Sequence, residues 1–236
     1  MYHYRISDQV PLKTKRLIIT PMNEKQIEAM LQRETENLLR GALNEMRRSV
    51  SEHPNQALWY TTWQISLRQS GEAVGLIGFQ GIPEDKTAEL GYDIFAAYRG
   101  NGYAQEAIQS LCGWAFGREN VYFVHALADE QNQAANHILE NLKFYRVESP
   151  VEGRVRWELE RPASAWMAVY MSIGLGLGLA LGSGFFGNMI SGMAVGLSAG
   201  LALGVALDSQ DRAARKRDNA PKRLDEEKQP AKKGEV

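Results

Sequence analysis

The chain contains one cysteine, Cys112, and only four histidines. A single cysteine excludes an internal disulfide and is typical of a reducing compartment. The histidines are scattered without the short spacing of metal ligands, so no metal site is expected. Lys and Arg (27) nearly balance Asp and Glu (28), which gives no general argument for nucleic acid, and none is expected as a partner. Residues 1–8 lack the apolar core of a signal peptide.

Charge is missing altogether from one long stretch. The 46 residues from Pro162 to Leu207 contain no Asp, Glu, Lys or Arg. A single helix of this length would measure ~69 Å, about twice the ~30 Å hydrocarbon core of a bilayer. We therefore predict two spans, at about residues 166–186 and 189–207, with a turn at Gly187 and Asn188.

Glycines recur every fourth residue in both spans. Residues at this spacing form one stripe on a helix, and stripes of small residues let two helix backbones pack closely in a membrane. The intervening leucines argue against a hydrophilic flexible linker. The pattern predicts a glycine-zipper transmembrane hairpin with the lipid bilayer as a partner, and the same stripes suit a homo-oligomer. The glycines are Gly174, Gly178 and Gly182, then Gly192, Gly196, Gly200 and Gly204.

Basic residues flank the stretch on both sides, so the positive-inside rule places both flanks in the cytoplasm. They are Arg154, Arg156 and Arg161 before it, and Arg212, Arg215, Lys216 and Arg217 after it. The tail beyond residue 207 is highly charged, contains two prolines and is expected to be disordered. The predicted organisation is a domain at 1–161, the hairpin at 162–207 and the tail at 208–236.

The first 161 residues mix strand and helix patterns in an α+β order. Asn23 and Gln26 have the spacing of a capping box that begins a helix, and Pro54 ends the following one. Strands are expected at 16–21, 59–67, 73–81, 88–95, 122–128, 144–148 and 154–160, and helices at 23–33, 36–52, 103–116 and 132–142.

A glycine-rich turn, Arg99-Gly100-Asn101-Gly102-Tyr103-Ala104, lies between the strand at 88–95 and the helix at 103–116. Glycines let backbone N–H groups approach an anion closely, and a helix start carries partial positive charge. Arg99 adds a donor for charge-assisted hydrogen bonds. The helix behind the turn has one apolar face, built from Ala104, Ala107, Ile108, Leu111, Cys112 and Ala115. The turn therefore predicts a phosphate site.

Four blocks in order resemble the GNAT superfamily of N-acetyltransferases. Arg99, Gly102 and Ala104 match its Gln/Arg-x-x-Gly-x-Gly/Ala signature, and the run from Glu89 through Ala107 is similar to the Rim-type subgroup that acetylates protein N-termini. Residues 12–19 resemble the first strand of that subgroup, and residues 132–144 its last helix and the next strand. The resemblance covers about residues 12–160 and implies a mixed, mostly antiparallel sheet flanked by helices.

The resemblance also implies a co-substrate, acetyl-coenzyme A, and roles for particular residues. The end of the splayed strand, Ile94 and Phe95, would bind the pantetheine arm, and the turn at 99–104 would hold the pyrophosphate. Asn132 matches an asparagine near the pantetheine, although a plain helix N-cap is an equal interpretation. Glu89 is the candidate base that accepts the proton of the amine.

Two positions depart from the family pattern. Leu139 stands where many members have a tyrosine that protonates the leaving thiolate, which leaves Tyr145 or solvent as alternatives. Lys143 replaces the glycine before Phe144, so the exit from the helix is expected to differ.

The sequence therefore predicts a membrane-tethered acetyltransferase that acts on a primary amine, either a protein N-terminus or a small molecule, with its domain and tail on the cytoplasmic side. Two alternatives stay open. One is a coenzyme A-binding regulatory module without turnover, and the other is a structural protein that oligomerises in the membrane and carries the GNAT domain as a passenger.

Overall fold

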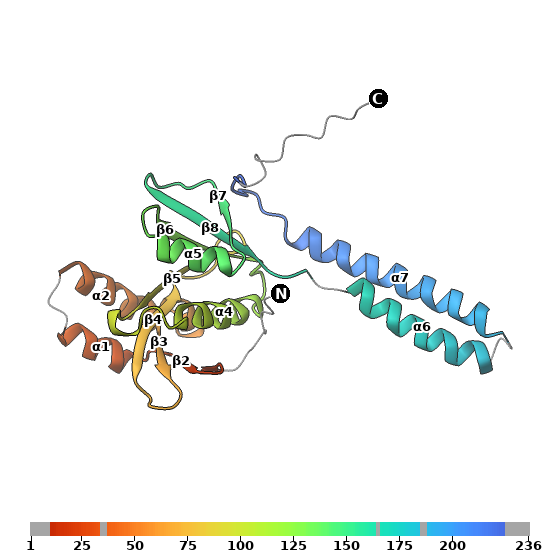
Figure 1. The fold of residues 1–236 in the computed structure, drawn as a ribbon, viewed down its shortest axis with the longest axis horizontal. Helices are drawn as coiled ribbons and strands as arrows, with labels where there is room; N and C mark the ends of the chain where they lie inside the picture. The colour runs from red at the N-terminus through yellow and green to blue at the C-terminus, as the bar shows by residue number, and fades with distance from the viewer. Residues whose placement is uncertain (1–9, 34–36, 164–165, 185–187, 225–236) are drawn as a thin grey trace, which may run out of the picture. The chain divides into compact units, whose positions relative to one another are not determined.

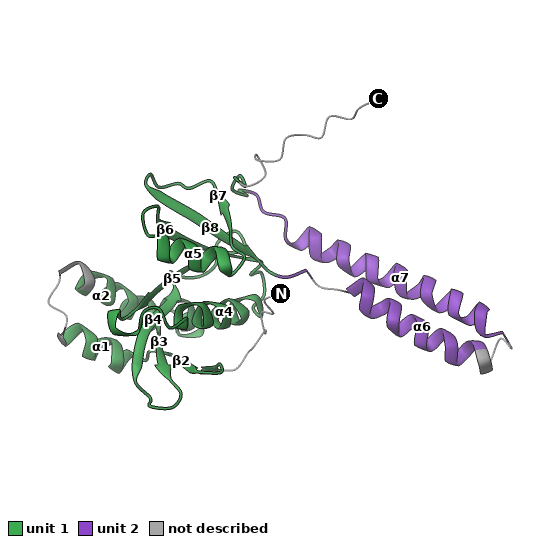
Figure 2. Ribbon diagram, viewed as in Figure 1, with its two compact units in different colours: residues 1–161, 219–236 green, residues 162–218 purple. Residues whose placement is uncertain are grey.

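The computed structural model describes residues 10–33, 37–163, 166–184 and 188–224 (Figure 1). The chain divides into two compact units (Figure 2). One contains the described residues up to Arg161 together with 219–224, and the other runs from Pro162 to Asp218. The first break coincides with the abrupt loss of charge after Arg161.

The first unit is built on an eight-stranded sheet in the order β1-β2-β3-β4-β5-β6-β8-β7. Every neighbouring pair is antiparallel except β5 and β6, which run parallel. The mixed, mostly antiparallel sheet predicted from the sequence is therefore confirmed. The strands are β1 (Leu12–Lys13), β2 (Leu17–Pro21), β3 (Thr62–Leu67), β4 (Ala73–Phe79), β5 (Thr87–Ile94), β6 (Phe123–Asp129), β7 (Tyr145–Val147) and β8 (Arg154–Glu160).

Helices cover both faces of this sheet. The helices of the unit are α1 (Glu24–Arg33), α2 (Asn37–Glu52), α3 (Ala57–Tyr60), α4 (Tyr103–Phe116) and α5 (Gln133–Asn141). Helix α1 begins with the predicted capping box, because Asn23 and Gln26 exchange backbone-to-side-chain hydrogen bonds of 3.0 Å. Side chains alternate between the two faces of β4. Ile77 joins the main core beneath α4, and neighbouring Leu76 packs in a separate cluster with residues of α1 and α2.

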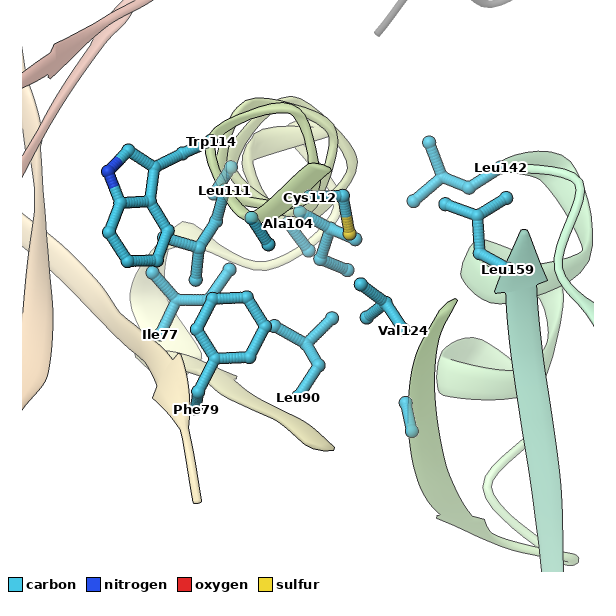
Figure 3. Packing of buried hydrophobic residues seen from close by; sticks show 14 of the residues in the cluster. Ile77, Phe79, Leu90, Ala104, Leu111, Cys112, Trp114, Val124, Leu142 and Leu159 are labelled. Atoms are coloured by element: carbon cyan, nitrogen blue, oxygen red, sulfur yellow. The ribbon is translucent and has the colours of Figure 1, made fainter. Parts of the chain in front are cut away.

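The main core is centred on α4 (Figure 3). All six residues of the predicted apolar face of α4 are buried. Trp114 and Phe116 are buried too, so the helix is enclosed on more than the one stripe that the sequence pattern indicates. The Trp114 ring lies 4.7 Å from that of Trp59, between centroids, and Trp59 lies 4.9 Å from Phe79. The start of the strand predicted at 59–67 was wrong, because residues 57–60 form α3 and β3 begins at Thr62. The packing of Trp59 in the core accounts for this difference.

At the exit from α5, Lys143 adopts the left-handed conformation (φ 69°) that glycine would supply without strain. A non-glycine residue there costs about 1–2 kcal/mol. The tail predicted to be disordered from residue 208 is helical to Ala214.

Residues 219–224 return to the first unit and extend its sheet. The amide of Glu148 donates to the carbonyl of Lys222 (2.8 Å), and that of Leu224 donates to Arg146 (3.1 Å). Arg223 lies 4.0 Å above the Tyr145 ring. The segment thereby pairs with the edge strand β7, which removes an edge that could template pairing with other chains. Residues 225–236 of the predicted tail lie outside the described residues.

The second unit is an antiparallel pair of helices, α6 (Trp166–Gly184) and α7 (Met189–Ala214). Helix α7 begins at Asn188, whose side chain accepts from the amide of Ile190, while Gly187 of the predicted turn and Phe186 lie outside the described residues. The helices meet along the predicted glycine positions. A Cβ added at Gly174 would overlap the carbonyl of Gly196. One added at Gly178 would likewise overlap Gly192.

Candidate functional site

A cleft opens in the first unit where the two parallel strands diverge. β5 and β6 pair only from Thr87–Glu89 to Phe123–His125. Beyond Glu89, β5 continues to Ile94 beside β4, and β6 continues beside β8. The gap contains a cavity of about 970 Å³, which is lined by the ends of both strands, the glycine turn and α5. The splayed strand that the family resemblance implied is therefore confirmed, and the volume suits a large organic ligand.

The glycine turn closes one end of the cleft. Gly100 (φ 79°) and Gly102 (φ 74°) both have the left-handed backbone that glycine adopts without strain. Gly102 is the N-cap of α4, and it has no side chain with which to cap the first turn of the helix. The Asn101 side chain instead donates to the carbonyls of Tyr98 and Arg99, which fixes the shape of the turn. The first N–H groups of α4 are thus available to an anion.

Arg99 ties the turn to the end of β5. Its Nε donates to the carbonyl of Ile94 (2.8 Å), and another guanidinium nitrogen lies 3.3 Å from Asp93. Arg99, Gly100, Asn101, Gly102, Tyr103 and Ala104 all line the cavity, as predicted for the phosphate end.

Arg16 is a supporting residue that the sequence analysis missed. It donates to the carbonyl of Asn101 (2.9 Å), pairs with Glu106 (2.7 Å) and lies over the Tyr103 ring. Burial alone would raise the pKa of Glu106, but hydrogen bonds from Thr14 and Arg16 hold that pKa below its ordinary value. No local pattern could reveal this contact, because Arg16 lies 85 residues from Asn101 in the chain.

The predicted pantetheine residues differ in their positions. Ile94 and Asn132 line the cavity, and the Asn132 side chain also caps α5 by accepting from Ala135 (3.0 Å). The N-cap interpretation of Asn132 is therefore confirmed, and its contact with the pantetheine stays a prediction. Phe95 does not line the cavity, and its amide already donates to Val74 (3.0 Å).

Glu89 lies where the strands begin to diverge, and it lines the cavity. Its carboxylate is 3.3 Å from Nε2 of His125, and the side chains are 32% and 14% exposed, respectively. The hydrogen bond to His125 lowers the pKa of Glu89 below its ordinary value, aided by the nearby charge of Arg156 and opposed by partial burial. Glu89 is therefore a carboxylate at neutral pH.

Neither Leu139 nor Tyr145 is placed to protonate the leaving thiolate. Leu139 is 1% exposed and packs in the core. Tyr145 does not line the cavity, and its hydroxyl donates to Glu158 (2.7 Å). Tyr145 therefore cannot take the role considered for it.

Tyr92 contributes a buried hydroxyl to the lining of this cleft. Its side chain lines the cavity, and its buried hydroxyl has no hydrogen-bond partner among the described residues. Burial raises the pKa of Tyr92 to about 12, so the hydroxyl stays protonated. An unpaired buried hydroxyl costs about 1–3 kcal/mol. The hydroxyl has almost no accessible surface, so a ligand reaches it only if the lining of the cleft shifts. The open helix start and the size of the cavity fit a long phosphorylated molecule such as acetyl-coenzyme A.

Comparison with known proteins assigns the family. Residues 16–145, more than half of the chain, match the family model described as "Acetyltransferase (GNAT) domain". The chain belongs to the GNAT acetyltransferase family. The matched range contains the glycine turn, Glu89 and every residue that lines the cavity except Arg154.

Curated relatives of this GNAT protein come from Bacillus. It is 34% identical over 86 residues to the uncharacterized N-acetyltransferase YjdG of Bacillus subtilis, over 36% of this chain and 51% of the relative. It is 29% identical over 85 residues to the uncharacterized N-acetyltransferase YoaA of the same species, over 36% of this chain and 48% of the relative. The chain thus spans about half the length of the curated relatives it matches.

Solved structures share the fold. An acetyltransferase from Agrobacterium tumefaciens is 19% identical with a TM-score of 0.52, over 67% of this chain and 99% of that one. RimL, a ribosomal L7/L12 α-N-protein acetyltransferase solved with coenzyme A, is 16% identical with a TM-score of 0.51, over 66% of this chain and 100% of that one.

Replacing Gly102 by valine should weaken the binding of acetyl-coenzyme A roughly 10- to 100-fold, the equivalent of about one lost charge-assisted hydrogen bond. A side chain there strains the left-handed N-cap, and its Cβ would lie 3.5 Å from the Arg16 guanidinium that supports the turn. Calorimetry measures the affinity. Gly71→Val is the matched control, because Gly71 has the same backbone conformation (φ 75°) with open space around it, outside the cavity lining. Equal affinity in the two folded variants would contradict the assignment.

Proposed function

We propose that the protein transfers an acetyl group from acetyl-coenzyme A to a primary amine. The observation that carries this proposal is the arrangement of the cleft. An anion-binding helix start lies at one end of the cavity, and an ionised carboxylate, Glu89, lies where the strands diverge.

The residues of the chain supply binding and proton transfer. The open N–H groups after Gly102 and the guanidinium of Arg99 hold the pyrophosphate, and the gap between β5 and β6 takes the pantetheine arm. Acetyl-coenzyme A supplies an activated thioester when bound. Glu89 accepts the proton that the amine loses as its nitrogen attacks the thioester carbon. The pair of electrons in the broken C–S bond leaves with sulfur.

The low pKa of Glu89 bears on the choice of amine. A weakly basic carboxylate is best matched to an acceptor that loses its proton easily. The α-amino group of a peptide has a pKa of about 7.7–8.0, and an alkyl amine such as lysine has one of about 10.4. The neutral fraction at pH 7 differs roughly 300-fold between them. The acceptor we favour is accordingly an α-amine.

An acceptor panel tests this function on the full-length protein. Release of free coenzyme A is measured with peptides bearing a free α-amine, a polyamine and an aminoglycoside. We expect turnover at pH 7 to be fastest with an α-amine peptide, by roughly 100-fold over the polyamine. Preference for the polyamine would contradict the choice of acceptor. Binding of acetyl-coenzyme A without turnover on any amine would instead favour the regulatory module, to which buried Leu139 in place of a tyrosine points.

We also propose that α6 and α7 tether the enzyme to a membrane. Among the described residues, only α7 is long and apolar enough by itself to cross a bilayer, and the apolar stretch described in α6, Trp166–Gly182, is shorter. Large apolar side chains nevertheless stay exposed on both helices, which suits lipid. They include Val169, Ile173, Leu177, Leu181, Ile190, Val195, Leu201, Leu203 and Val205.

The basic flanks favour an orientation with the acetyltransferase domain and the tail on the cytoplasmic side of this proposed tether. The tether predicts that the full-length protein resists carbonate extraction and that protease reaches both flanks from the cytoplasmic side. Recovery in the soluble fraction would refute it, and access to only one flank would mean a single span. Self-association through the glycine stripes is tested in the same preparation by its oligomeric state.

A further inference from the structure

One face of the sheet, opposite α4, has a row of polar side chains across the strands that border the cleft. Leu90, Val124 and Trp157 point into the core beneath α4. Their alternating neighbours Glu89, His125 and Arg156 lie on the other face of β5, β6 and β8. They form a connected chain, from Glu89 Oε2 to His125 Nε2 (3.3 Å) and from His125 Nδ1 to an Arg156 nitrogen (3.2 Å).

The chemistry of arginine decides the protonation of His125. A guanidinium only donates hydrogen bonds, so Nδ1 of His125 must accept and therefore carries no proton. The remaining proton sits on Nε2, where it is donated to Glu89. With Nδ1 accepting from Arg156, the ring is fixed in the tautomer whose proton on Nε2 faces Glu89.

We propose that His125, locked by Arg156, is a positioning residue that orients the Glu89 carboxylate at the mouth of the cleft. This inference rests on the proposed function of Glu89 as base. His125 is the only hydrogen-bond partner of the Glu89 side chain among the described residues. Without it, a carboxylate that is one-third exposed would sample other rotamers.

The groups that face His125 come from both neighbouring strands. Glu89 lies on β5, and Arg156 and Glu158 lie on β8, where Glu158 is directly opposite His125 in the register. The Glu158 carboxylate accepts from Tyr145. The pH dependence of kcat/KM in the test below therefore reflects Glu89, His125, Arg156 and Glu158 together.

The test compares His125→Leu, which removes the donor, with His125→Gln, which keeps an N–H donor that does not titrate. We expect His125→Leu to lower kcat about 10-fold with little change in KM for acetyl-coenzyme A, and His125→Gln to retain activity within about 3-fold. We also compare how kcat/KM, calculated for the neutral amine, falls at acidic pH. In the leucine variant alone this fall should move to higher pH, because Glu89 loses the hydrogen bond that stabilises its charge and its pKa rises. Equal losses in both variants, or a fall that does not move, would overturn the proposal.

A second measurement needs no turnover. NMR of full-length protein with isotope-labelled histidine, in detergent if required, reports the tautomer of His125 directly, and His125→Gln assigns its signal. We expect the Nε2–H form at neutral pH, and loss of this preference in Arg156→Gln. An imidazolium or an Nδ1–H form in the native protein would overturn the inference. If the Nε2–H tautomer is found but no amine is acetylated, the proposed function is contradicted, while the hydrogen bond between His125 and Glu89 is supported.

Discussion

Glu89→Gln should lower kcat at pH 7 by about 10²–10⁴-fold, the usual cost of losing a general base. Glutamine has the same shape and can still meet His125, but it cannot take a proton. Affinity for acetyl-coenzyme A should stay nearly unchanged, because Glu89 lies away from the phosphate end of the cavity. Coenzyme A release and calorimetry measure these two quantities separately.

The pH dependence of Glu89→Gln distinguishes a base from a structural carboxylate. Because the folded protein lowers the pKa of Glu89, the native carboxylate stays ionised down to below pH 4.5, and its contribution is lost only as the pH falls through that lowered value. The deficit of the variant should shrink as the pH rises above the amine pKa, where the acceptor is already neutral. A deficit that is the same at every pH would remove the base role, and full activity at pH 7 would remove Glu89 from the mechanism.

Asp93→Asn is the matched control for this experiment. Asp93 lies on the same strand, lines the same cavity and pairs with Arg99 rather than with a histidine. Its substitution should weaken acetyl-coenzyme A binding modestly, because the pair is well exposed, and should leave kcat within a few-fold of native. If Asp93→Asn lowered kcat more than Glu89→Gln, Asp93 rather than Glu89 would be the general base.

Local signals predicted much of this site. The helix at 103–116 was predicted with both of its boundaries because its apolar period is unbroken and glycines precede it. The two glycines have the left-handed backbone that a tight turn requires, so composition and geometry agree there. Glu89 was found through its place in a motif, and its position beside the cavity follows from the strand order.

What the sequence could not show depends on contacts between distant segments. The pairing of Glu89 with His125 needs the parallel register of β5 and β6, and Arg156 joins only because β8 lies beside β6. The residue type of Lys143 does not suggest its left-handed backbone, because lysine rarely adopts that conformation. The return of residues 219–224 to β7 is similarly invisible, because a charged segment with a proline resembles a solvated tail until an open sheet edge is known.

Filling the glycine stripe should separate α6 from α7. A Cβ at Gly196 would overlap the carbonyl of Gly174, and one at Gly200 would overlap that of Tyr170, so neither site has room for a side chain. We expect Gly196→Leu with Gly200→Leu to move the helix axes to about 8–10 Å apart, the usual spacing when larger side chains lie between helices. Spin labels at the exposed positions Ile173 and Val195, in a Cys112→Ala background, measure the change as a distance distribution.

Gly176→Leu provides the control for this substitution, because Gly176 is a helical glycine of α6 with nothing within 4 Å of an added Cβ. It adds one leucine where the double variant adds two, at a site with open space for the side chain, so its label distances should match the native ones. Both variants should stay in the membrane fraction if the helices insert, since neither loses apolar length. The outcome then separates two properties of the segment. Loss of packing with retained membrane association assigns the glycines to helix pairing and the exposed leucines to lipid, and unchanged distances in the double variant would mean that the stripe does not hold the helices together.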